Sequence, residues 1–258
     1  MARVLVTGSA DGIGHVTARQ LAERGHAVTL HARSEARAST ARGRVPTAEA
    51  AVVGDLSSLA QVRGIADQAN ALGRYDAVVH NAGVGYQWSQ RQVTEDGLSE
   101  VFAVNVLAPY VLTALMDRPD RIVTVSSGMH LGQQPDLDDL QWERRRWDGW
   151  GPYSESKLWD VVLAFALARL WPDVRANAVD PGWVPTRMGG PGAPDDLELG
   201  ADTQAWLAAG EGDAATTTGT YLHHRQPQPA HPAASDPATH DALLAACARL
   251  SGATLPPP

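Results

Sequence analysis

Short apolar segments alternate with longer segments of mixed polarity along almost the whole chain. The short segments hold consecutive Val, Leu, Ile and Ala residues without polar alternation, as in strands that are buried on both faces of a sheet. The predicted strands are residues 3–6, 27–31, 51–53, 77–79, 121–126, 175–179 and a last one near 220–222. In the longer segments apolar residues recur with helical spacing, which predicts helices at 12–24, 59–72, 98–116 and 154–171.

Strands and helices alternate throughout, and this order predicts an α/β fold: a doubly wound parallel sheet of about seven strands with helices on both faces. There is no internal repeat and no linker, so we expect a single domain over residues 1–258. No apolar segment approaches the roughly 20 residues that span a bilayer, and the N-terminus lacks the pattern of a secretory signal. We therefore expect a cytoplasmic protein without a membrane span.

Two segments interrupt the alternation, at about 131–151 and 189–201, and the second is rich in Gly, Pro and Asp. Both follow strand ends on the carboxyl side of the sheet, where doubly wound folds bind ligands, so we predict substrate loops. The first carries Trp142, Trp147 and Trp150. Together with Trp183, these side chains either line a pocket for a bulky lipophilic or aromatic molecule or pack the loop onto the body.

Composition excludes several classes of function. The formal net charge of −8 argues against a nucleic-acid partner, because phosphate neutralisation requires a basic surface. One basic run, residues 144–146, lies between acidic neighbours, and we interpret it as a solvated loop surface. Nine histidines occur without the spacing of a metal site, so no metal is expected. The single cysteine, Cys247, cannot form an internal disulfide, which favours a reducing compartment.

The chain contains 20 arginines and one lysine, Lys157. A lone lysine in an arginine-rich chain indicates a position where a compact, titratable ammonium is needed and a guanidinium will not serve. Tyr153 lies four residues earlier in a predicted helix, so the two side chains share one face. A nearby ammonium lowers the pKa of a tyrosine from its ordinary value of about 10. Such a phenol can exchange a proton with a carbonyl oxygen.

A glycine-rich turn, residues 7–14 (TGSADGIG), joins the first predicted strand directly to a helix. Glycines allow the backbone to turn tightly and to approach a pyrophosphate, which then lies at the positive N-terminus of the helix. A strand–turn–helix unit of this kind indicates a dinucleotide site in a Rossmann-type sheet.

Further motifs follow in a fixed order, and together they resemble the short-chain dehydrogenase/reductase family over nearly the whole chain. They are Asn81-Ala82-Gly83, Asn105, Ser126-Ser127, Tyr153 with Lys157, and Pro181-Gly182. Within that family the chain is most similar to the retinol-dehydrogenase-like branch of carbonyl reductases. The residues that carry this similarity are Ser126 to His130, Asp138-Asp139-Leu140, Tyr221, Asp236 and Leu250-Ser251-Gly252.

The resemblance implies a catalytic set of Asn105, Ser127, Tyr153 and Lys157. Ser126 stays an alternative to Ser127, because a slip of one residue in a strand exchanges the side chain that faces the cleft. The resemblance also implies a set of cofactor contacts that includes Tyr153 and Lys157. Its other members are Gly8, Ala10, Asp11, Gly12, Ile13, Asp55, Leu56, Asn81, Ala82, Gly83, Pro181, Gly182, Val184 and Thr186.

The end of the second predicted strand bears on the choice of cofactor. An acid at this place would hold the ribose diol of NAD, but here Ala32 is followed by Arg33. A guanidinium can pair bidentately with a 2′-phosphate, so we expect NADP(H) rather than NAD(H). Asp11 in the glycine-rich turn opposes this expectation, because a carboxylate repels a phosphate unless it is turned away.

The sequence therefore predicts an enzyme that transfers a hydride between nicotinamide and a carbonyl or alcohol group of a small molecule. One alternative is reduction of an activated C=C bond on the same fold. Another is a cofactor-sensing protein without turnover, against which the intact Tyr153, Lys157 and Ser127 argue, since a sensor needs no proton donor. Family members commonly form dimers or tetramers, so a homo-oligomer is compatible with the sequence.

Overall fold

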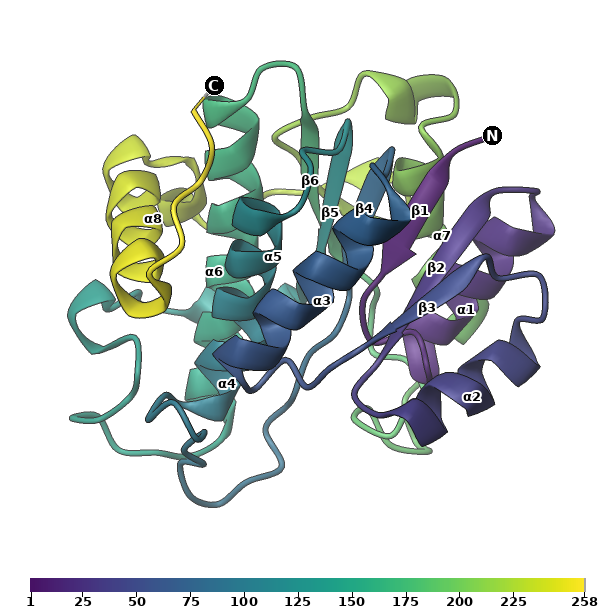
Figure 1. Cartoon of the computed structure of the whole chain (residues 1–258). Coiled ribbons are helices and arrows are strands. Elements are labelled where there is room, and N and C mark those ends of the chain that lie inside the picture. Colours follow the sequence, from purple (N-terminus) through teal and green to yellow (C-terminus); the bar gives the residue numbers. More distant parts are fainter. Residues whose placement is uncertain (258) are drawn as a thin grey trace.

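The computed structural model describes residues 1–257 and contains one eight-stranded sheet, in the order β3-β2-β1-β4-β5-β6-β7-β8 (Figure 1). All neighbouring strands are parallel except the last pair. The strands are β1 Arg3–Val6, β2 Ala27–Ala32, β3 Ala50–Val53, β4 Ala77–His80, β5 Arg121–Val125, β6 Arg175–Asp180, β7 Tyr221–His223 and β8 Gln226–Pro227. The doubly wound parallel sheet is confirmed, with one short antiparallel edge strand beyond the seven expected.

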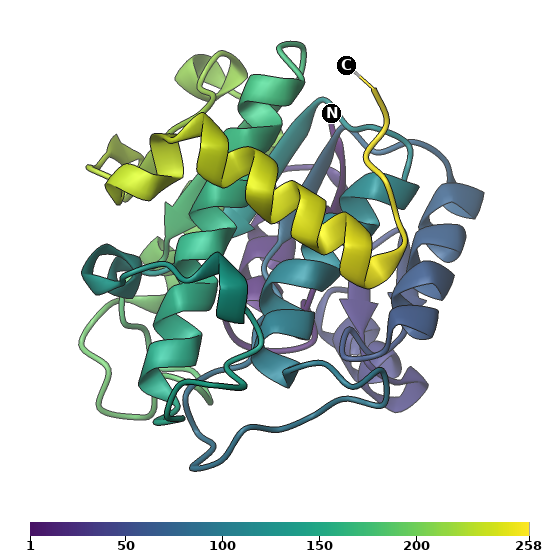
Figure 2. The ribbon, with the colours of Figure 1, turned by 90° about the vertical axis from the view of Figure 1, so that its left-hand side faces the viewer.

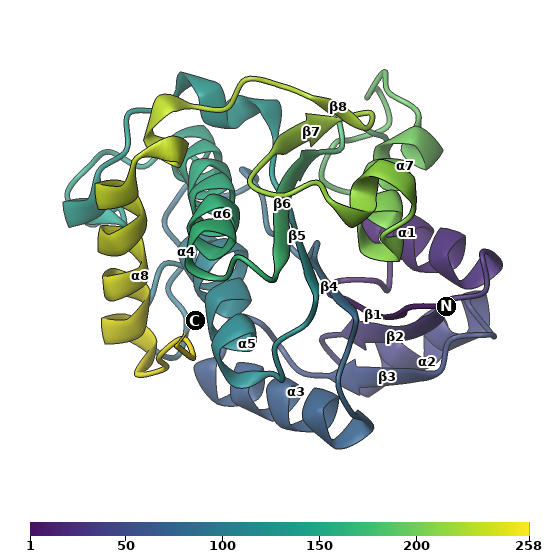
Figure 3. The ribbon, with the colours of Figure 1, turned by 90° about the horizontal axis from the view of Figure 1, so that it is seen from above.

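Helices cover both faces of the sheet (Figure 3). On one face lie α1 Gly12–Glu23, α2 Glu35–Arg44 and α7 Leu197–Ala209. On the other lie α3 Leu59–Leu72, α4 Glu100–Phe102, α5 Ala108–Leu115 and α6 Trp150–Leu170. The last helix, α8 Pro237–Ser251, packs outside α6 and α5 as a further layer (Figure 2).

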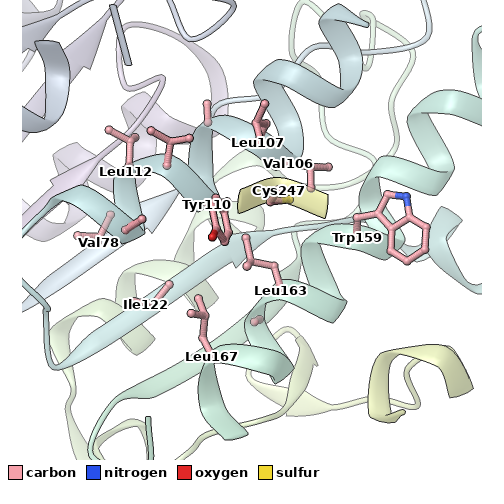
Figure 4. Close-up of a cluster of buried hydrophobic side chains, with 14 of the residues drawn as sticks. Val78, Val106, Leu107, Tyr110, Leu112, Ile122, Trp159, Leu163, Leu167 and Cys247 are labelled. Carbon is pink, nitrogen blue, oxygen red and sulfur yellow. The ribbon is translucent and has the colours of Figure 1, made fainter. Parts of the chain in front are cut away.

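Each strand contributes to two hydrophobic cores, because successive side chains point to opposite faces. In β1, Leu5 belongs to the core under α3, α5 and α6, whereas Val4 and Val6 belong to the core under α1 and α7. Because both faces of each strand are buried, the strand sequences are apolar without polar alternation. Figure 4 shows part of the first core, in which Cys247 of α8 lies buried among aliphatic side chains.

Two helices were not predicted, α2 and α7. Only Ala38 and Ala41 of α2 are buried, so this helix has no apolar stripe to detect. Helix α7 begins inside the segment 189–201, which we predicted as a substrate loop; there the side chain of Asp196 accepts hydrogen bonds from the N–H groups of Glu198 and Leu199. Capping by Asp196 thus allows a helix to begin directly after a Gly- and Pro-rich stretch, whose composition alone predicts a loop.

The predicted helix 98–116 is divided into α4, a π-helical turn over Ala103–Leu107, and α5. Pro109 explains the division, because it has no N–H to donate to the carbonyl of Asn105 one turn earlier. Among residues 1–257, no helix combines the length and the apolar character required to cross a membrane.

Candidate active site

The strand order reverses between β1 and β4, and two adjoining cavities open at the carboxyl ends of the strands there, as expected at a topological switch point. The glycine-side cavity, of about 490 Å³, is lined by the glycine-rich turn, Arg33, Asp55 and Leu56. The tyrosine-side cavity, of about 600 Å³, is lined by Ser127, Tyr153, Lys157 and the segment after β6. Ile13, Asn81, Gly83, Thr186 and Met188 line both cavities.

The glycine-rich turn leaves space that side chains would fill. Gly8 and Gly12 have φ angles of +64° and +56°, which L side chains rarely adopt. A Cβ on Gly14 would lie 2.2 Å from Nδ2 of Asn81, and one on Gly8 would lie 2.9 Å from Cα of Ala82. No side chain caps the N-terminus of α1. These features fit a pyrophosphate at the helix N-terminus, where the first N–H groups of α1 would hold it.

Two side chains fasten the turn to the sheet. Asn81 donates from Nδ2 to the carbonyl of Thr7 at 2.9 Å. His31 of β2 is buried, and its Nδ1 accepts the N–H of Gly8 at 2.9 Å while Nε2 lies 3.0 Å from the carbonyl of Gly54. This pattern requires a neutral ring protonated on Nε2, and burial lowers the pKa of His31. Sequence reasoning missed His31, since a histidine within a strand carries no motif.

Arginines surround Asp11 at the rim of the glycine-side cavity. Its carboxylate lies 2.8 Å from Arg37, 2.9 Å from Arg44 and 3.9 Å from Arg187. Partial burial raises the pKa of Asp11, but hydrogen bonds from Arg44 and Arg37 outweigh burial and lower it. Arg33 is exposed, lines the same cavity and forms no ion pair within residues 1–257. The carboxylate that opposed NADP(H) is therefore engaged by guanidinium groups.

Tyr153 and Lys157 both lie on the buried part of α6, and Nζ of Lys157 is 5.7 Å from the centre of the Tyr153 ring. Lys157 donates to the carbonyl of Val125 at 3.0 Å and to Oδ2 of Asp160 at 2.8 Å. Within residues 1–257 the Tyr153 hydroxyl makes no hydrogen bond, which leaves it available in the cavity.

The pKa of Tyr153 differs from our expectation. Burial raises it, and this effect is larger than the lowering by Lys157, so the pKa lies above its ordinary value. Burial also disfavours the ammonium of Lys157, but Asp160 and Tyr153 outweigh burial and raise the pKa of Lys157. The phenol is thus protonated and the lysine charged at neutral pH.

The two serines at the end of β5 face different ways. Ser126 is buried, and its hydroxyl donates to the backbone carbonyl of Lys157 at 2.7 Å. Ser127 is half-buried, lines the tyrosine-side cavity and accepts a hydrogen bond from the N–H of Met129. Its carbonyl is 2.8 Å from Nδ1 of the fully buried His130. Ser127, rather than Ser126, has a hydroxyl available for a ligand.

Asn105 lies in the π-helical turn and links three segments. Its side-chain amide exchanges two hydrogen bonds with the backbone of Val84, at 2.8 and 3.0 Å, and donates to Oγ of Ser156 at 2.9 Å. A Cβ on Gly83 would lie 3.4 Å from Oδ1 of Asn105 and 3.5 Å from Nζ of Lys157. Asn105 is therefore close to the lysine, but its side chain is fully occupied.

The segment after β6 contributes to the lining of both cavities. Pro181, Gly182 and Val184 line the tyrosine-side cavity, and Thr186 lines both cavities. Two carboxylates hold this segment by its backbone: Asp180 accepts the N–H of Gly182 at 2.9 Å, and Asp195 accepts the N–H of Trp183 at 2.6 Å.

Aromatic residues form one wall of the tyrosine-side cavity. Trp150 stacks on Tyr86 with ring centres 3.9 Å apart, and Tyr86 meets the edge of Tyr153 at 5.4 Å. Trp150 and Trp183 keep 52% and 57% of their surface exposed. Trp142 and Trp147 do not line this cavity. They pack against each other within the loop. The pocket-lining interpretation therefore applies to Trp150 and Trp183, and the loop-packing interpretation applies to Trp142 and Trp147.

The 131–151 segment is fixed to α6 by an ion-pair cluster. Arg145 pairs with Asp139 at 3.1 Å and with Glu155 at 2.8 Å, and both carboxylates are buried. The Arg145 guanidinium also lies 4.0 Å from the ring of Trp142, whose Nε1 donates to Glu155. Our interpretation of residues 144–146 as a solvated surface is wrong for Arg145, because its guanidinium is half-buried against two buried carboxylates.

A glycine cradle beside a helix that presents a free phenol, at the point where the strand order reverses, is the arrangement of a dinucleotide-dependent oxidoreductase. The model of the short chain dehydrogenase family matches residues 2–196. The chain belongs to this family.

Curated relatives are consistent with this family. The chain is 42% identical over 260 residues to an uncharacterized oxidoreductase, AN7799, of Emericella nidulans, with 99% of each covered. It is 32% identical to human retinol dehydrogenase 13, covering 98% of this chain and 85% of the relative, which fits the predicted branch.

Among solved structures, a protein of Mycobacterium paratuberculosis without an assigned function has a TM-score of 0.85 at 29% identity, with 99% and 95% of the chains covered. A blue fluorescent protein from a metagenomic library, solved in complex with NADPH, has a TM-score of 0.66 at 26% identity, covering 86% and 95%.

Proposed function

We propose that the chain acts as a single-domain, NADP(H)-dependent ketoreductase that interconverts a carbonyl compound and a secondary alcohol. The observation that carries this proposal is the free Tyr153 hydroxyl in a cavity that adjoins the glycine cradle, with the ammonium of Lys157 beside its ring. A protonated phenol at this place is a general acid for a carbonyl oxygen.

The nicotinamide cofactor supplies a hydride for reduction when it is bound. Tyr153 donates its hydroxyl proton to the carbonyl oxygen of the substrate, and Ser127 holds that oxygen with a hydrogen bond. The charge of Lys157 stabilises the phenolate that Tyr153 becomes. In the oxidation direction the phenolate accepts the alcohol proton. Two of the three lysine donors are used by Val125 and Asp160, which leaves one for a ribose hydroxyl.

We assign Asn105 a supporting role in returning a proton to Tyr153. The missing N–H of Pro109 leaves the Asn105 carbonyl without its usual helical donor, so this carbonyl can hold a water molecule near Lys157. The side-chain bonds of Asn105 to Val84 and Ser156 keep the turn in place.

The preference for NADP(H) rests on Arg33. Its guanidinium is unpaired within residues 1–257 and lines the glycine-side cavity, as does Arg37, while Asp11 faces arginines. A charge-assisted contact with a 2′-phosphate contributes about 1.5–3 kcal/mol. The related NADPH complex supports the same choice.

The substrate we propose is a bulky aromatic or lipophilic ketone without a negative charge. Trp150, Tyr86 and Trp183 offer flat apolar surfaces to it. Of the described residues that line this cavity, Lys157 is the only Lys or Arg, and it already pairs with Asp160. The carboxylates of Asp180 and Asp195 also line the cavity and disfavour an acidic substrate.

The test is a panel of aryl ketones, aldehydes and enones with NADPH and NADH, followed through the absorbance of the reduced nicotinamide. We expect aryl ketones to be reduced to alcohols, and we expect kcat/KM to be higher with NADPH. A ratio below one overturns the cofactor assignment. Product analysis that finds only saturated ketones from enones identifies a C=C reductase instead.

A further inference from the structure

Asp160 is a buried acid that the proposed mechanism does not use. It lies one helical turn after Lys157 on α6, and only 2% of its surface is exposed. Its Oδ2 is 2.8 Å from Nζ of Lys157, and its backbone carbonyl accepts the hydroxyl of Thr124 on β5. The acid is thus held at the junction between α6 and the central strand.

A buried ion pair is seldom the most stable choice, since apolar residues of similar size often replace such a pair at no loss. The burial of Lys157 follows from its position beside Tyr153. Asp160 then keeps the ammonium charged in this environment, because its Coulombic attraction raises the lysine pKa against the effect of burial. The same negative charge also acts on Tyr153, in the opposite sense to the lysine.

We propose that Asp160 is a positioning residue that holds the ammonium of Lys157 beside the Tyr153 ring and partly balances its charge. This inference rests on the proposed ketoreductase function. Its consequence is that the alkaline limit of ketone reduction, and the pH at which alcohol oxidation begins, depend on the charge at position 160.

The charged groups around Tyr153 are few. Lys157 and Asp160 act from α6, Asp180 from the end of β6 and Tyr86 from the segment after β4. Lys157 is the only one that lowers the Tyr153 pKa, while burial, Asp160, Tyr86 and Asp180 raise it. Asp160 itself faces Lys157, and burial raises the pKa of Asp160 to about 6. The carboxyl is therefore ionised in the alkaline range where Tyr153 loses its proton.

The experiment compares wild type with Asp160→Asn, which keeps the shape and an acceptor for Lys157 but removes the charge. We measure kcat/KM against pH for aryl ketone reduction and for oxidation of the corresponding alcohol, each with saturating cofactor. Removing one nearby negative charge is expected to move both alkaline transitions down by about one pH unit. A purely structural role lowers the rates without moving the transitions, and that result overturns the proposal.

Two further variants serve as controls. Asp160→Glu restores the charge and is expected to return the transitions toward wild type. Asp202→Asn removes a carboxylate that pairs with Arg24 and Arg225 away from the site, and its transitions are expected to match wild type. If Asp202→Asn shifts them equally, the effect belongs to overall charge and the proposal is wrong.

A direct measurement does not depend on the folding of a variant at position 160. Ultraviolet difference titration of wild type against Tyr153→Phe gives the midpoint of Tyr153 itself. We expect it above about 10, the ordinary tyrosine value, and a midpoint near neutrality contradicts the inference. Absence of turnover by wild type with every carbonyl compound refutes the proposed function instead, whereas turnover with unshifted transitions in Asp160→Asn refutes only the role of Asp160.

Discussion

The two cavities are built by different means. The glycine-side cavity depends on what is missing: Cβ atoms at Gly8 and Gly14 would collide with Ala82 and Asn81. The tyrosine-side cavity depends on side chains that come from distant segments, such as Trp150, Trp183 and Ser127. The first is therefore specified by the local backbone and the second by tertiary packing. Substitutions should separate cofactor binding from proton transfer along this division.

The largest effect is expected for Tyr153→Phe. Removing the hydroxyl removes the general acid, which contributes about 10²–10⁴-fold to such reactions, so kcat is expected to fall by roughly that factor. The dissociation constant for NADPH, measured by fluorescence titration, is expected to stay within about threefold of wild type, a minor effect on a scale where tenfold is 1.4 kcal/mol. Retained turnover would mean that another group donates the proton.

Lys157→Arg comes next, with an expected loss of about 10²-fold in kcat/KM, toward the lower end of proton-transfer effects. The planar guanidinium is larger than an ammonium and cannot keep both bonds, to Val125 and to Asp160, in the same buried space. Steady-state kinetics and a thermal melt are measured together, so that misfolding is distinguished from lost chemistry. Unimpaired activity refutes our interpretation of the single lysine.

Arg33→Ala tests the glycine-side cavity. We expect kcat/KM with NADPH to fall about tenfold to a hundredfold, the value of one charge-assisted phosphate contact, while that with NADH changes little. Arg187→Ala is the matched control: its guanidinium has 80% of its side-chain surface exposed and lies 3.9 Å from Asp11, so a smaller effect is expected. Equal losses of kcat/KM with both cofactors indicate that Arg33 does not bind the 2′-phosphate.

The smallest effect concerns His31 and pH. Because burial lowers its pKa below the ordinary 6.5, His31 is neutral at neutral pH and its Nδ1 accepts the Gly8 N–H. The neutral His31 ring contributes to the stability of the folded protein at neutral pH. This contribution is lost as the pH falls from 6.5, the ordinary histidine pKa, toward the lower pKa of His31 in the folded protein. We expect NADPH binding to weaken a few-fold on acidification in wild type.

In His31→Asn this part of the pH dependence is expected to disappear, and isothermal calorimetry at several pH values measures it. The 2′-phosphate titrates near pH 6 in both proteins, so the difference between wild type and variant isolates the ring. Parallel curves for the two proteins exclude His31 as the source.

Prediction from the sequence succeeded where local backbone chemistry decides the structure. The unbroken apolar segments predicted the strands of a parallel sheet, and this sheet is confirmed. The glycines of residues 7–14 line the glycine-side cavity. It failed where partners are far apart in the chain. The ion pairs of Arg145 join a loop to α6, and the acceptor role of His31 depends on a turn 23 residues away. Asp160 was missed for a different reason: it lies only three residues from Lys157, but the burial of this ion pair appears only in the folded structure.

The far edge of the sheet ends in β8, a strand of two residues that includes Pro227. Proline offers no amide hydrogen to an approaching chain, and so short a strand is a poor template for β-pairing. Growth of the sheet from one molecule into the next is therefore disfavoured at this edge. We therefore expect this edge to contribute little to fibrous aggregation.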